Sequence, residues 1–476
     1  MLIFIKMEVI INKMIDYKKL GFKCGLEIHQ QLDGKKLFCS CPCITNKSAE
    51  PDFKITRKLR AVAGEKGEKD VAALYEESRD REFIYEVYRD CNCLVELDCE
   101  PPHEVNKDAL KTALTVALLL NARIEKNIKF MRKIVVDGSN TTGFQRTALI
   151  ARNGFIETSK GRVRIDTIFL EEEAAKKIKE EGDRVIYRLD RLGIPLIEIA
   201  TAPDIVDSEH AKESASIIGM ILRSVDGIKR GLGTIRQDVN LSINGKPRIE
   251  IKGFQELKSI SRVIEIEVER QLKTKNLKSE VRNAKKDGSS EFLRPLPGEA
   301  RMYPETDVPE IIIDNKLLKS IKLPELKIEK SVKLEEKYRL REDLAREIID
   351  EDIDFEGYVK RFENVKPEFI AKVLVDMRKE IKTRFDLETK PDEILEYLNE
   401  GKISEINFFE LLVEKAQGKK INLEKYKQPG DLDSEIKKII RENKNASFNA
   451  IMGEVMKKFR GKADPKNVAE LIKREV

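Results

Sequence analysis

The sequence has no apolar run long enough to cross a membrane. A membrane-spanning helix needs roughly 18 to 20 apolar residues, and the stretch VALLL at 116–120 is far shorter. A secretory leader is not indicated either, because charged residues interrupt the opening MLIFIKMEVIINKMI and no small-residue cleavage site follows it. We therefore expect a cytoplasmic protein with reduced cysteines, translated from Met1, Met7 or Met14.

The sequence also lacks an excess of one charge. Its 90 Lys and Arg residues against 85 Asp and Glu residues leave a formal net charge of only +5. This balance excludes a uniformly basic surface of the kind that binds nucleic acid without selectivity. Local basic faces remain open, and the density of Lys and Arg in the last third of the chain is compatible with an RNA partner.

The usual nucleotide-binding and amide-hydrolysing motifs are missing as well. We find neither a GxxxxGK[ST] loop nor a kinase-type GxGxxGxV loop, so any nucleotide would have to be held in another way. There is no GxSxG elbow, no Gly/Ser-rich amidase signature and no complete Thr/Lys/Asp set of the asparaginase type. The sequence therefore carries no recognised site for releasing ammonia from an amide.

What the sequence does contain predicts about three domains for its 476 residues. Residues 19–315 alternate short strand-like runs with turn signals and a few helices, which predicts an α+β domain with a mixed, largely antiparallel sheet. From about residue 323 the pattern becomes helical and rich in Lys, Glu, Leu and Ile. We expect an all-helical domain at 316–392 and a helical tail module at 393–476.

The stretch GLEIHQ at 25–30 places an acid and a histidine two residues apart. In an extended strand, Glu27 and His29 share one face while Leu26 and Ile28 share the other. A sheet can present a metal or phosphate site in this way, but a half-buried strand with one hydrogen-bonded histidine gives the same pattern. This stretch alone leaves both interpretations open.

Three later stretches repeat the pattern of acids on strands. The segment 235–243 places Asp238 and Asn240 on one face, and the segment 248–252 does the same for Glu250 and Lys252. A run of three acids follows the apolar strand end at 168–170. Taken singly, each is also typical of a solvated strand face or of an acidic helix start. The three acids of that run are Glu171, Glu172 and Glu173.

Carboxylates gathered with one imidazole repel each other unless cations lie among them. Such a donor set favours Mg²⁺ or Mn²⁺ over zinc, and phosphoryl transfer uses these cations together with Lys or Arg. Two glycines, Gly231 and Gly233, could let the backbone pass close to phosphates, although a plain tight turn also explains them. The candidate phosphate-binding cations are Lys252, Arg191, Arg294 and Arg301.

The seven cysteines fall into two groups and one isolated residue, Cys24. Four thiolates suffice for a structural zinc site, so we consider Cys39, Cys41, Cys91 and Cys93 as a candidate set. Their spacing is C-x-C rather than the usual C-x-x-C, and alternating strand residues produce it too. Buried, unligated thiols are the alternative.

Two further stretches are unusual. Glu198 lies within the apolar strand pattern at 193–200, which costs stability unless the carboxylate is paired or hydrogen-bonded. The proline-rich, charged segment 294–307 is either a connector between domains or a loop that carries binding groups.

Together these segments resemble the B/E family of tRNA-dependent amidotransferase subunits, and in particular the archaeal E type that acts on glutamyl-tRNA(Gln). The similarity runs from residue 18 to the end of the chain. It is carried by GLEIHQQLDGKKLFC, GSNTTGFQRTALIARNGFIE, LEEEAAK, RLDRLGIPLIEIATAPDI, IRQDVNLSI, RIEIKGFQELKSI, RPLPGEARMYPETDVP and FNAIMGEVMKKFRGKADPKNVAELI.

The resemblance implies an enzyme subunit that uses ATP and Mg²⁺ to phosphorylate the γ-carboxylate of glutamate carried by tRNA(Gln). Ammonia from an asparaginase-like amidase subunit would then displace phosphate to give Gln-tRNA(Gln). Family members of this kind are expected as heterotetramers with two copies of both subunits. The resemblance also implies a cradle-shaped catalytic domain and a C-terminal tail that contacts the tRNA.

Carried over position by position, the resemblance implies that Glu27 and His29 are the acid and the histidine of the family's metal site. Glu172 is the favoured match for its second acid among the three consecutive acids. Asp238 matches the acid of the family's R-x-D-x-N-x-S strand, and Glu250 that of its E-x-K strand. Strand alternation selects these same groups.

The sequence departs from the family pattern in two places. An inserted domain like one in bacterial aspartyl-tRNA synthetase is expected ahead of RPLPGEARMYPETD, but only residues 272–290 lie there. Its absence leaves open a B-type subunit that also acts on Asp-tRNA(Asn), and a non-catalytic tRNA-binding scaffold is a further alternative. The cysteines are also more numerous than expected for the E type, although some B-type subunits bind zinc in the equivalent region.

Overall fold

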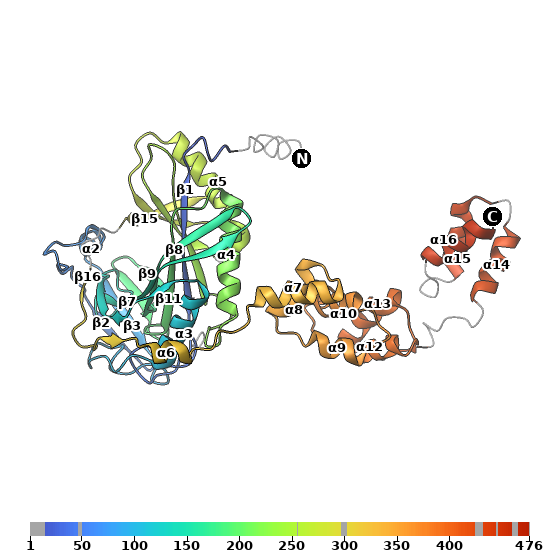
Figure 1. Cartoon of the computed structure of the whole chain (residues 1–476), viewed down its shortest axis with the longest axis horizontal. Helices are drawn as coiled ribbons and strands as arrows, with labels where there is room; N and C mark the ends of the chain where they lie inside the picture. Colours follow the sequence, from blue (N-terminus) through green and yellow to red (C-terminus); the bar gives the residue numbers. More distant parts are fainter. Residues whose placement is uncertain are drawn as a thin grey trace. The chain divides into compact units, whose positions relative to one another are not determined.

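The computed structural model describes residues 15–45, 50–254, 256–296, 302–423, 432–443, 446–458 and 465–475 (Figure 1). Its contacts divide the chain into two compact units, Met1–Leu326 and Lys327–Val476. The first unit is a mixed sheet domain and the second is helical, which confirms the α+β prediction. Among the described residues, no helix combines the length and the apolar character that a membrane crossing requires.

The first unit is built on an eleven-stranded sheet with β1 at its centre. Apart from the parallel pair β13 and β14, neighbouring strands in the order are antiparallel. The strand order is β15-β14-β13-β12-β1-β11-β8-β7-β6-β16, with β4 (Arg123–Ile124) also paired to β7. The strands are β1 (Lys23–Gln31), β6 (Phe130–Ile134), β7 (Phe144–Thr158), β8 (Gly161–Glu172), β11 (Pro195–Thr201), β12 (Ile235–Ser242), β13 (Ile249–Phe254), β14 (Glu280–Ala284), β15 (Ser290–Pro295) and β16 (Met302–Pro304).

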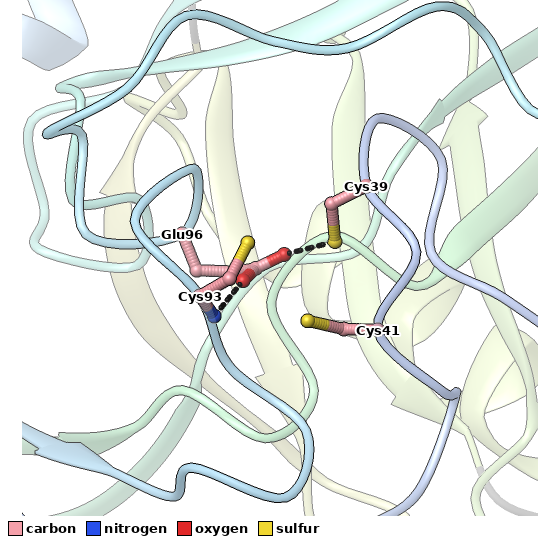
Figure 2. Close-up of side chains that lie close together, drawn as sticks. All are labelled: Cys39, Cys41, Cys93 and Glu96. Atoms are coloured by element: carbon pink, nitrogen blue, oxygen red, sulfur yellow. Dashed lines mark hydrogen bonds between the residues drawn. The ribbon is translucent and has the colours of Figure 1, made fainter.

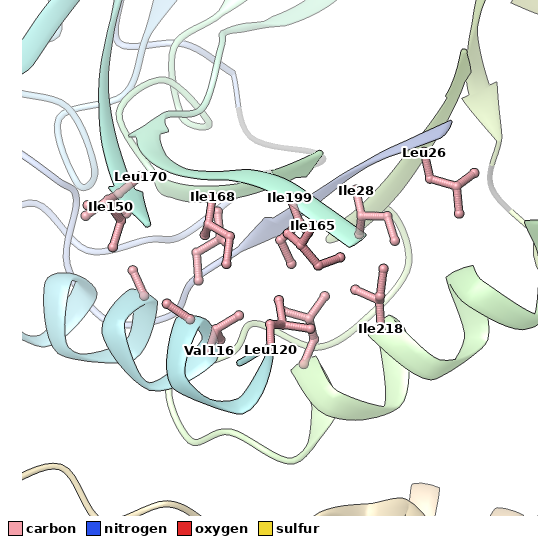
Figure 3. Packing of buried hydrophobic residues seen from close by; sticks show 14 of the residues in the cluster. Leu26, Ile28, Val116, Leu120, Ile150, Ile165, Ile168, Leu170, Ile199 and Ile218 are labelled. Atoms are coloured by element: carbon pink, nitrogen blue, oxygen red, sulfur yellow. The ribbon is translucent and has the colours of Figure 1, made fainter. Parts of the chain in front are cut away.

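One face of this sheet is apolar and covered by helices. Side chains of Leu26 and Ile28 from β1 lie in one core with Ile218 of α4 (Ser208–Arg223), and Val116 of α3 (Lys107–Leu119) joins them (Figure 3). The helix α5 (Leu257–Lys273) contributes further buried residues to this core. Because strand side chains alternate, burying Leu26 and Ile28 turns their neighbours to the opposite face.

Capping residues fix where two of these helices begin. The Asn106 side chain accepts hydrogen bonds from the first backbone N–H groups of α3, and the Asp207 side chain accepts one from His210 N in α4. Such caps satisfy donors that the helix itself leaves unpaired, and each stabilises a helix by about 1 kcal/mol. They hold the two helices at the register in which their apolar stripes meet the sheet.

A smaller four-stranded sheet lies elsewhere in the first unit, in the order β2-β3-β10-β9. Its buried core includes Tyr85 and Tyr187. Its strands are β2 (Phe53–Arg57), β3 (Glu82–Val87), β9 (Lys176–Glu181) and β10 (Arg184–Arg188). The remaining elements of the unit are the strand pair β5 (Asn127–Ile128) and β17 (Ile311–Ile312), with helices α2 (Val71–Glu77) and α6 (Asn315–Ser320).

The second unit contains two separate apolar clusters. One spans residues 334–412, and Ile394 and Leu395 of α12 share it with the helices before them. The other spans residues 436–472. The first cluster contains residues on both sides of the predicted domain boundary at residue 392. The division into three domains therefore stays a prediction. The helical segments are α7 (Lys327–Tyr338), α8 (Glu342–Asp350), α9 (Phe355–Arg361), α10 (Pro367–Lys372), η1 (Val373–Met377), α11 (Arg378–Phe385), α12 (Asp392–Asn399), α13 (Glu405–Ala416), α14 (Leu432–Glu442), α15 (Phe448–Lys458) and α16 (Pro465–Glu475).

Candidate active site

The face of the large sheet opposite the helices carries the predicted Glu27, His29 and Asp238. In the strand register, Glu27 of β1 lies opposite Asp238 of β12, and His29 lies opposite Glu198 of β11. Directly opposed residues of paired strands share a face. One ligand atom each from Glu27, His29 and Asp238 lie within 4.8 Å of one another. His29 also forms a second such group, with Glu171 and Glu198.

His29 is held between acids on two sides. Its Nε2 lies 3.2 Å from Oε2 of Glu198. Burial lowers the pKa of His29, but the hydrogen bond and the charge of Glu198 outweigh burial, so that the pKa lies above its ordinary value. For Glu198, burial acts to raise the pKa, but Lys133 and His29 outweigh burial and lower it. This carboxylate therefore stays ionised.

Glu27 shows a shift of the opposite direction to that of Glu198. Burial raises the pKa of Glu27, and the negative charge of Glu198 raises it further. The amide of Asn240 donates a hydrogen bond of 3.0 Å to Glu27, which only partly compensates. This electrostatic cost is the one that a bound divalent cation would remove.

Two lysines flank the acids along the sheet. Lys133 of β6 places Nζ 2.8 Å from Glu171 and 3.7 Å from Glu198. Lys252 of β13 places Nζ 2.7 Å from Asp238 and 2.6 Å from Glu250. Burial lowers the pKa of Lys252, but the neighbouring carboxylates outweigh it, so the pKa is raised and the lysine stays charged. The sequence places Glu250 and Lys252 on one strand face, and the structure adds the contact of Lys252 with Asp238.

The structure separates the three consecutive acids. Glu171 faces the histidine, whereas the carboxylate of Glu172 lies 3.4 Å from the guanidinium of Arg146. Adjacent residues of a strand point to opposite faces, so Glu171 and Glu172 cannot join the same group. Glu172, the residue favoured for the metal site from sequence, is placed on the other face, and Glu171 takes that position.

Two members of this site are not selected by the sequence patterns. Glu198 stands out there only as an acid in an apolar strand, and the structure explains it, because His29 and Lys133 pair with it. Lys133 gives no signal, since its strand comes beside the acids only through the pairing of β6 with β7 and of β7 with β8.

A basic pocket of about 540 Å³ adjoins the end of β1. It brings together Arg191, Gly231 and Gly233, three of the residues predicted to bind a nucleotide. Both glycines have positive φ, +115° and +80°, where other residues are strained. The six basic residues of its lining are Lys176, Arg188, Arg191, Lys229, Arg230 and Arg236.

The end of β1 also holds the glycine loop in place. The Gln30 side chain donates hydrogen bonds to the carbonyl oxygens of Lys229, at 2.9 Å, and Thr234, at 3.3 Å. The backbone N–H of Gln31 donates to the same Thr234 carbonyl at 2.9 Å. One strand therefore carries the acidic group and anchors the pocket beside it.

The other two predicted phosphate-binding cations are not part of this arrangement. Arg294 lies on β15, which is separated from β12 by β14 and β13 in the strand order. Arg301 lies outside the described residues. Nothing further is assigned to these two.

Three of the predicted cysteines converge with an acid (Figure 2). Ligand atoms of Cys39, Cys41, Cys93 and Glu96 lie within 4.8 Å of one another, and Cys91 is not in this group. Cys39 Sγ donates to Oε1 of Glu96 at 2.9 Å, and the Cys93 backbone N–H donates to Oε2 at 2.8 Å. Cys91 and Cys93 lie in a turn and the irregular chain after it, not in a strand. The rule that strand residues two apart share one face therefore does not apply to them.

Two thiols of this group, Cys39 and Cys93, are electrostatically disfavoured as thiolates. Burial raises the pKa of Cys39, and the charge of Glu96 raises it further. Burial and Glu96 likewise raise the pKa of Cys93 to about 11. The buried Lys36 ammonium lies 3.6 Å from Glu96 and offsets part of the negative charge.

Comparison with known proteins identifies the family. The model of the GatB/GatE catalytic domain matches residues 22–319, and that of the GatB domain matches residues 354–476. The chain belongs to the GatB/GatE family. It is 37% identical to the E-type subunit of the glutamyl-tRNA(Gln) amidotransferase of Methanocaldococcus jannaschii, over 97% of this chain and 99% of that protein. It is 36% identical to the corresponding subunits of Archaeoglobus fulgidus and Methanosarcina barkeri, again over 97% of the chain.

The first of these alignments extends over 626 positions, more than the 476 residues of this GatB/GatE chain. The relative therefore contains residues without a counterpart here. This fits the insert that is missing from the sequence ahead of the RPLPGEARMYPETD segment.

Proposed function

We propose that this chain is the ATP- and Mg²⁺-dependent subunit of a cytoplasmic glutamyl-tRNA(Gln) amidotransferase. The observation that carries the proposal is the acidic group around His29, flanked by Lys133 and Lys252, on one sheet face. Beside it lies a basic pocket of a size that can accept a nucleotide. The names of the relatives supply the tRNA substrate.

The donor set fits Mg²⁺. Carboxylate oxygens are its preferred protein ligands, and the raised pKa of Glu27 reports negative charge that is not fully compensated. Glu27, Asp238, Glu171 and Glu198 would hold the ion or ions together with His29. When bound, Mg²⁺ neutralises phosphate oxygens and so lowers the repulsion between ATP and the attacking carboxylate.

In the proposed reaction, a γ-carboxylate oxygen of the tRNA-bound glutamate forms a bond to the γ-phosphorus of ATP. The bond from that phosphorus to the bridging oxygen breaks, and ADP leaves with the electron pair. Ammonia then attacks the carbonyl carbon of the acyl phosphate, loses a proton, and phosphate departs. Lys252 stays charged beside the acids, and Lys133 lies 2.8 Å from Glu171, where both can stabilise the transferring phosphoryl group.

A partner amidase is part of the proposal. We propose an asparaginase-like protein as the source of ammonia and a heterotetramer with two copies of both partners. The sequence itself carries no recognised amide-hydrolysing set.

The proposal is tested by giving the full chain Glu-tRNA(Gln), ATP, Mg²⁺ and ammonium chloride, without the amidase. We expect ATP consumption that depends on Glu-tRNA(Gln), and formation of Gln-tRNA(Gln). Failure of both, with and without an amidase partner, would refute the proposal and favour a tRNA-binding scaffold. Against that alternative, every acid that strand alternation selected is present.

A parallel assay with Asp-tRNA(Asn) tests the B-type alternative. The missing insert removes a segment that could discriminate between tRNAs. Amidation of both misacylated tRNAs at comparable kcat/KM would assign a B-type activity. Amidation of Glu-tRNA(Gln) alone would restrict the chain to the glutamine pathway.

We also propose a structural zinc ion held by Cys39, Cys41 and Cys93, with Glu96 as the fourth ligand. The four groups match the ligand number of structural zinc, and carboxylates replace thiolates in some sites. A bound cation would reverse the raised pKa values of Cys39 and Cys93.

Metal analysis of the purified chain tests this site. We expect about one zinc per chain for the unmodified protein and for Cys91→Ser, whereas Cys93→Ser should lose the metal. Zinc lost by Cys91→Ser as well as by Cys93→Ser would restore the four-cysteine set expected from sequence.

A further inference from the structure

Glu173 ends the acidic run, and the proposed reaction assigns it no part. Its carboxylate is almost completely buried, with a side-chain exposure of 1%. Both of its oxygens accept hydrogen bonds from Arg236 Nη2 at 2.8 Å, and Gln31 Nε2 donates to Oε2 at 2.9 Å. Arg191 Nε lies 4.0 Å from Oε1. One hidden carboxylate thus lies between two guanidinium groups.

Both arginines line the basic pocket. Arg236 also lies directly opposite His29 in the β1–β12 register, so it shares the face of the acidic group. Its side chain is 35% exposed, in contrast to the hidden Glu173. The guanidinium of Arg236 therefore lies where the pocket meets the acids. Glu173 is not in the pocket lining and contacts three residues that are, Arg236, Arg191 and Gln31.

The chain around Glu173 is itself fixed. Arg191 donates hydrogen bonds to the carbonyl oxygens of Ala174, at 2.8 Å, and Ala175, at 2.9 Å. The backbone groups of Glu173 bond to Gly193 and Ile194. Arg side chains carry large rotamer entropy, so a pre-oriented guanidinium binds an anion at lower entropic cost than a mobile one.

We infer that Glu173 is a positioning residue, which holds Arg236 and Arg191 so that the pocket receives a polyphosphate with its terminal phosphate toward His29. This inference rests on the proposed function for the identity of the polyphosphate as ATP. For anion binding by a Glu173→Gln variant, the inference predicts the opposite of what charge alone predicts. Removing a negative charge beside an anion site should strengthen anion binding, whereas releasing the two arginines should weaken it.

The test measures binding of inorganic tripolyphosphate to the full chain by calorimetry at fixed salt, in three variants. Glu173→Gln removes the negative charge of the carboxylate and keeps the size of the side chain. Arg236→Lys keeps the positive charge and replaces the planar guanidinium by an ammonium group. Glu267→Gln is the matched control, because Glu267 is equally buried and accepts two bonds of 2.8 Å from Arg270 on α5, outside the pocket.

We expect Glu173→Gln and Arg236→Lys each to weaken tripolyphosphate binding about tenfold, the effect of one charge-assisted hydrogen bond, and Glu267→Gln to leave it unchanged. The KM for ATP should rise while the KM for Glu-tRNA(Gln) stays constant, a split that general destabilisation would not produce. A folded Glu173→Gln protein that binds tripolyphosphate as tightly as the parent, or more tightly, overturns the inference. If Glu173→Gln does not fold, Arg236→Lys is used instead. A folded Arg236→Lys protein that binds tripolyphosphate as tightly as the parent, or more tightly, then overturns the inference.

The outcomes separate this inference from the proposed function. A parent chain that binds tripolyphosphate but consumes no ATP with Glu-tRNA(Gln) refutes the proposed function and leaves the variant comparison valid. A parent chain that is active, with Glu173→Gln equally active and of unchanged KM for ATP, refutes the positioning role alone. A parent chain that does not bind tripolyphosphate overturns the inference directly.

Discussion

At the scale of single residues, strand alternation predicts which polar groups share a face. Glu27, His29 and Asp238 come together as the sequence indicates. Alternation does not show which of Glu171, Glu172 and Glu173 lies on the face of His29. The face that each residue occupies depends on bulges in the pairing of β8 with β7 and β11. A single irregular residue exchanges the two faces, so the choice of Glu172 rests on the family resemblance and not on alternation.

The distinction between these two acids gives the first prediction. Glu171→Gln should reduce ATP consumption by at least a hundredfold with unchanged tRNA affinity, because it removes a carboxylate beside His29. Glu172→Gln should instead lower the free energy of unfolding by about 1 to 3 kcal/mol, because a buried partner of Arg146 loses its charge. Single-turnover ATP assays and chemical denaturation of both variants check this. Equal loss of activity in both would place Glu172 in the site.

At the scale of elements, several strands of the large sheet could be anticipated, but their order could not. Periodicity and turn residues mark the segments that form β1, β8, β12 and β13. No local signal indicates that β6 and β11 come to lie on the same side of β1, since that follows from the pairing of distant residues. Lys133 escapes sequence reasoning for this reason, and Glu198 is recognisable only as an anomaly.

The segment that precedes β17 is held by a buried ion cluster, which gives the second prediction. Glu305 lies 2.7 Å from both Arg132 and Arg146, and its side chain is fully buried. Burial acts to raise its pKa, but these arginines outweigh burial and lower it. Glu305→Gln should therefore lower the free energy of unfolding of the first unit by about 3 kcal/mol at pH 7.

The pH dependence of this effect has a definite sign. A carboxylate whose folded-state pKa is depressed stabilises the protein above its unfolded pKa, about 4.3 for glutamate. That stabilisation is lost as the pH falls through the lower folded-state value. Denaturation midpoints of the parent and of Glu305→Gln should converge on acidification below about pH 4. A difference that stays constant down to about pH 3 would contradict this account.

At the scale of the whole molecule, the last helices form a cluster of their own. The apolar residues of 436–472 pack with each other and not with the cluster at 334–412. Composition indicates a helical tail, and its packing as a separate cluster required the structure. The family resemblance implies that this tail contacts tRNA.

Truncation after residue 423 gives the third prediction. The shortened chain should keep its tripolyphosphate affinity, because the pocket belongs to the first unit. Its affinity for tRNA(Gln) should fall by more than tenfold, with a smaller salt dependence, because basic contacts to phosphates are removed. Filter binding at two salt concentrations measures both effects. An unchanged tRNA affinity would exclude a role of the tail in tRNA binding.

The central position of β1 has a consequence for the folding of the protein during its synthesis on the ribosome. The side chains of Glu27 and Asn240 are hydrogen-bonded across 213 residues of sequence. At synthesis rates of about 5 to 20 residues per second, β1 waits roughly 10 to 40 seconds for its β12 neighbour to be made. During that time the backbone edge of β1 that pairs with β12 is open to other chains. We therefore expect newly made chains to depend on a chaperone that shields the N-terminal strand until residue 242 has emerged.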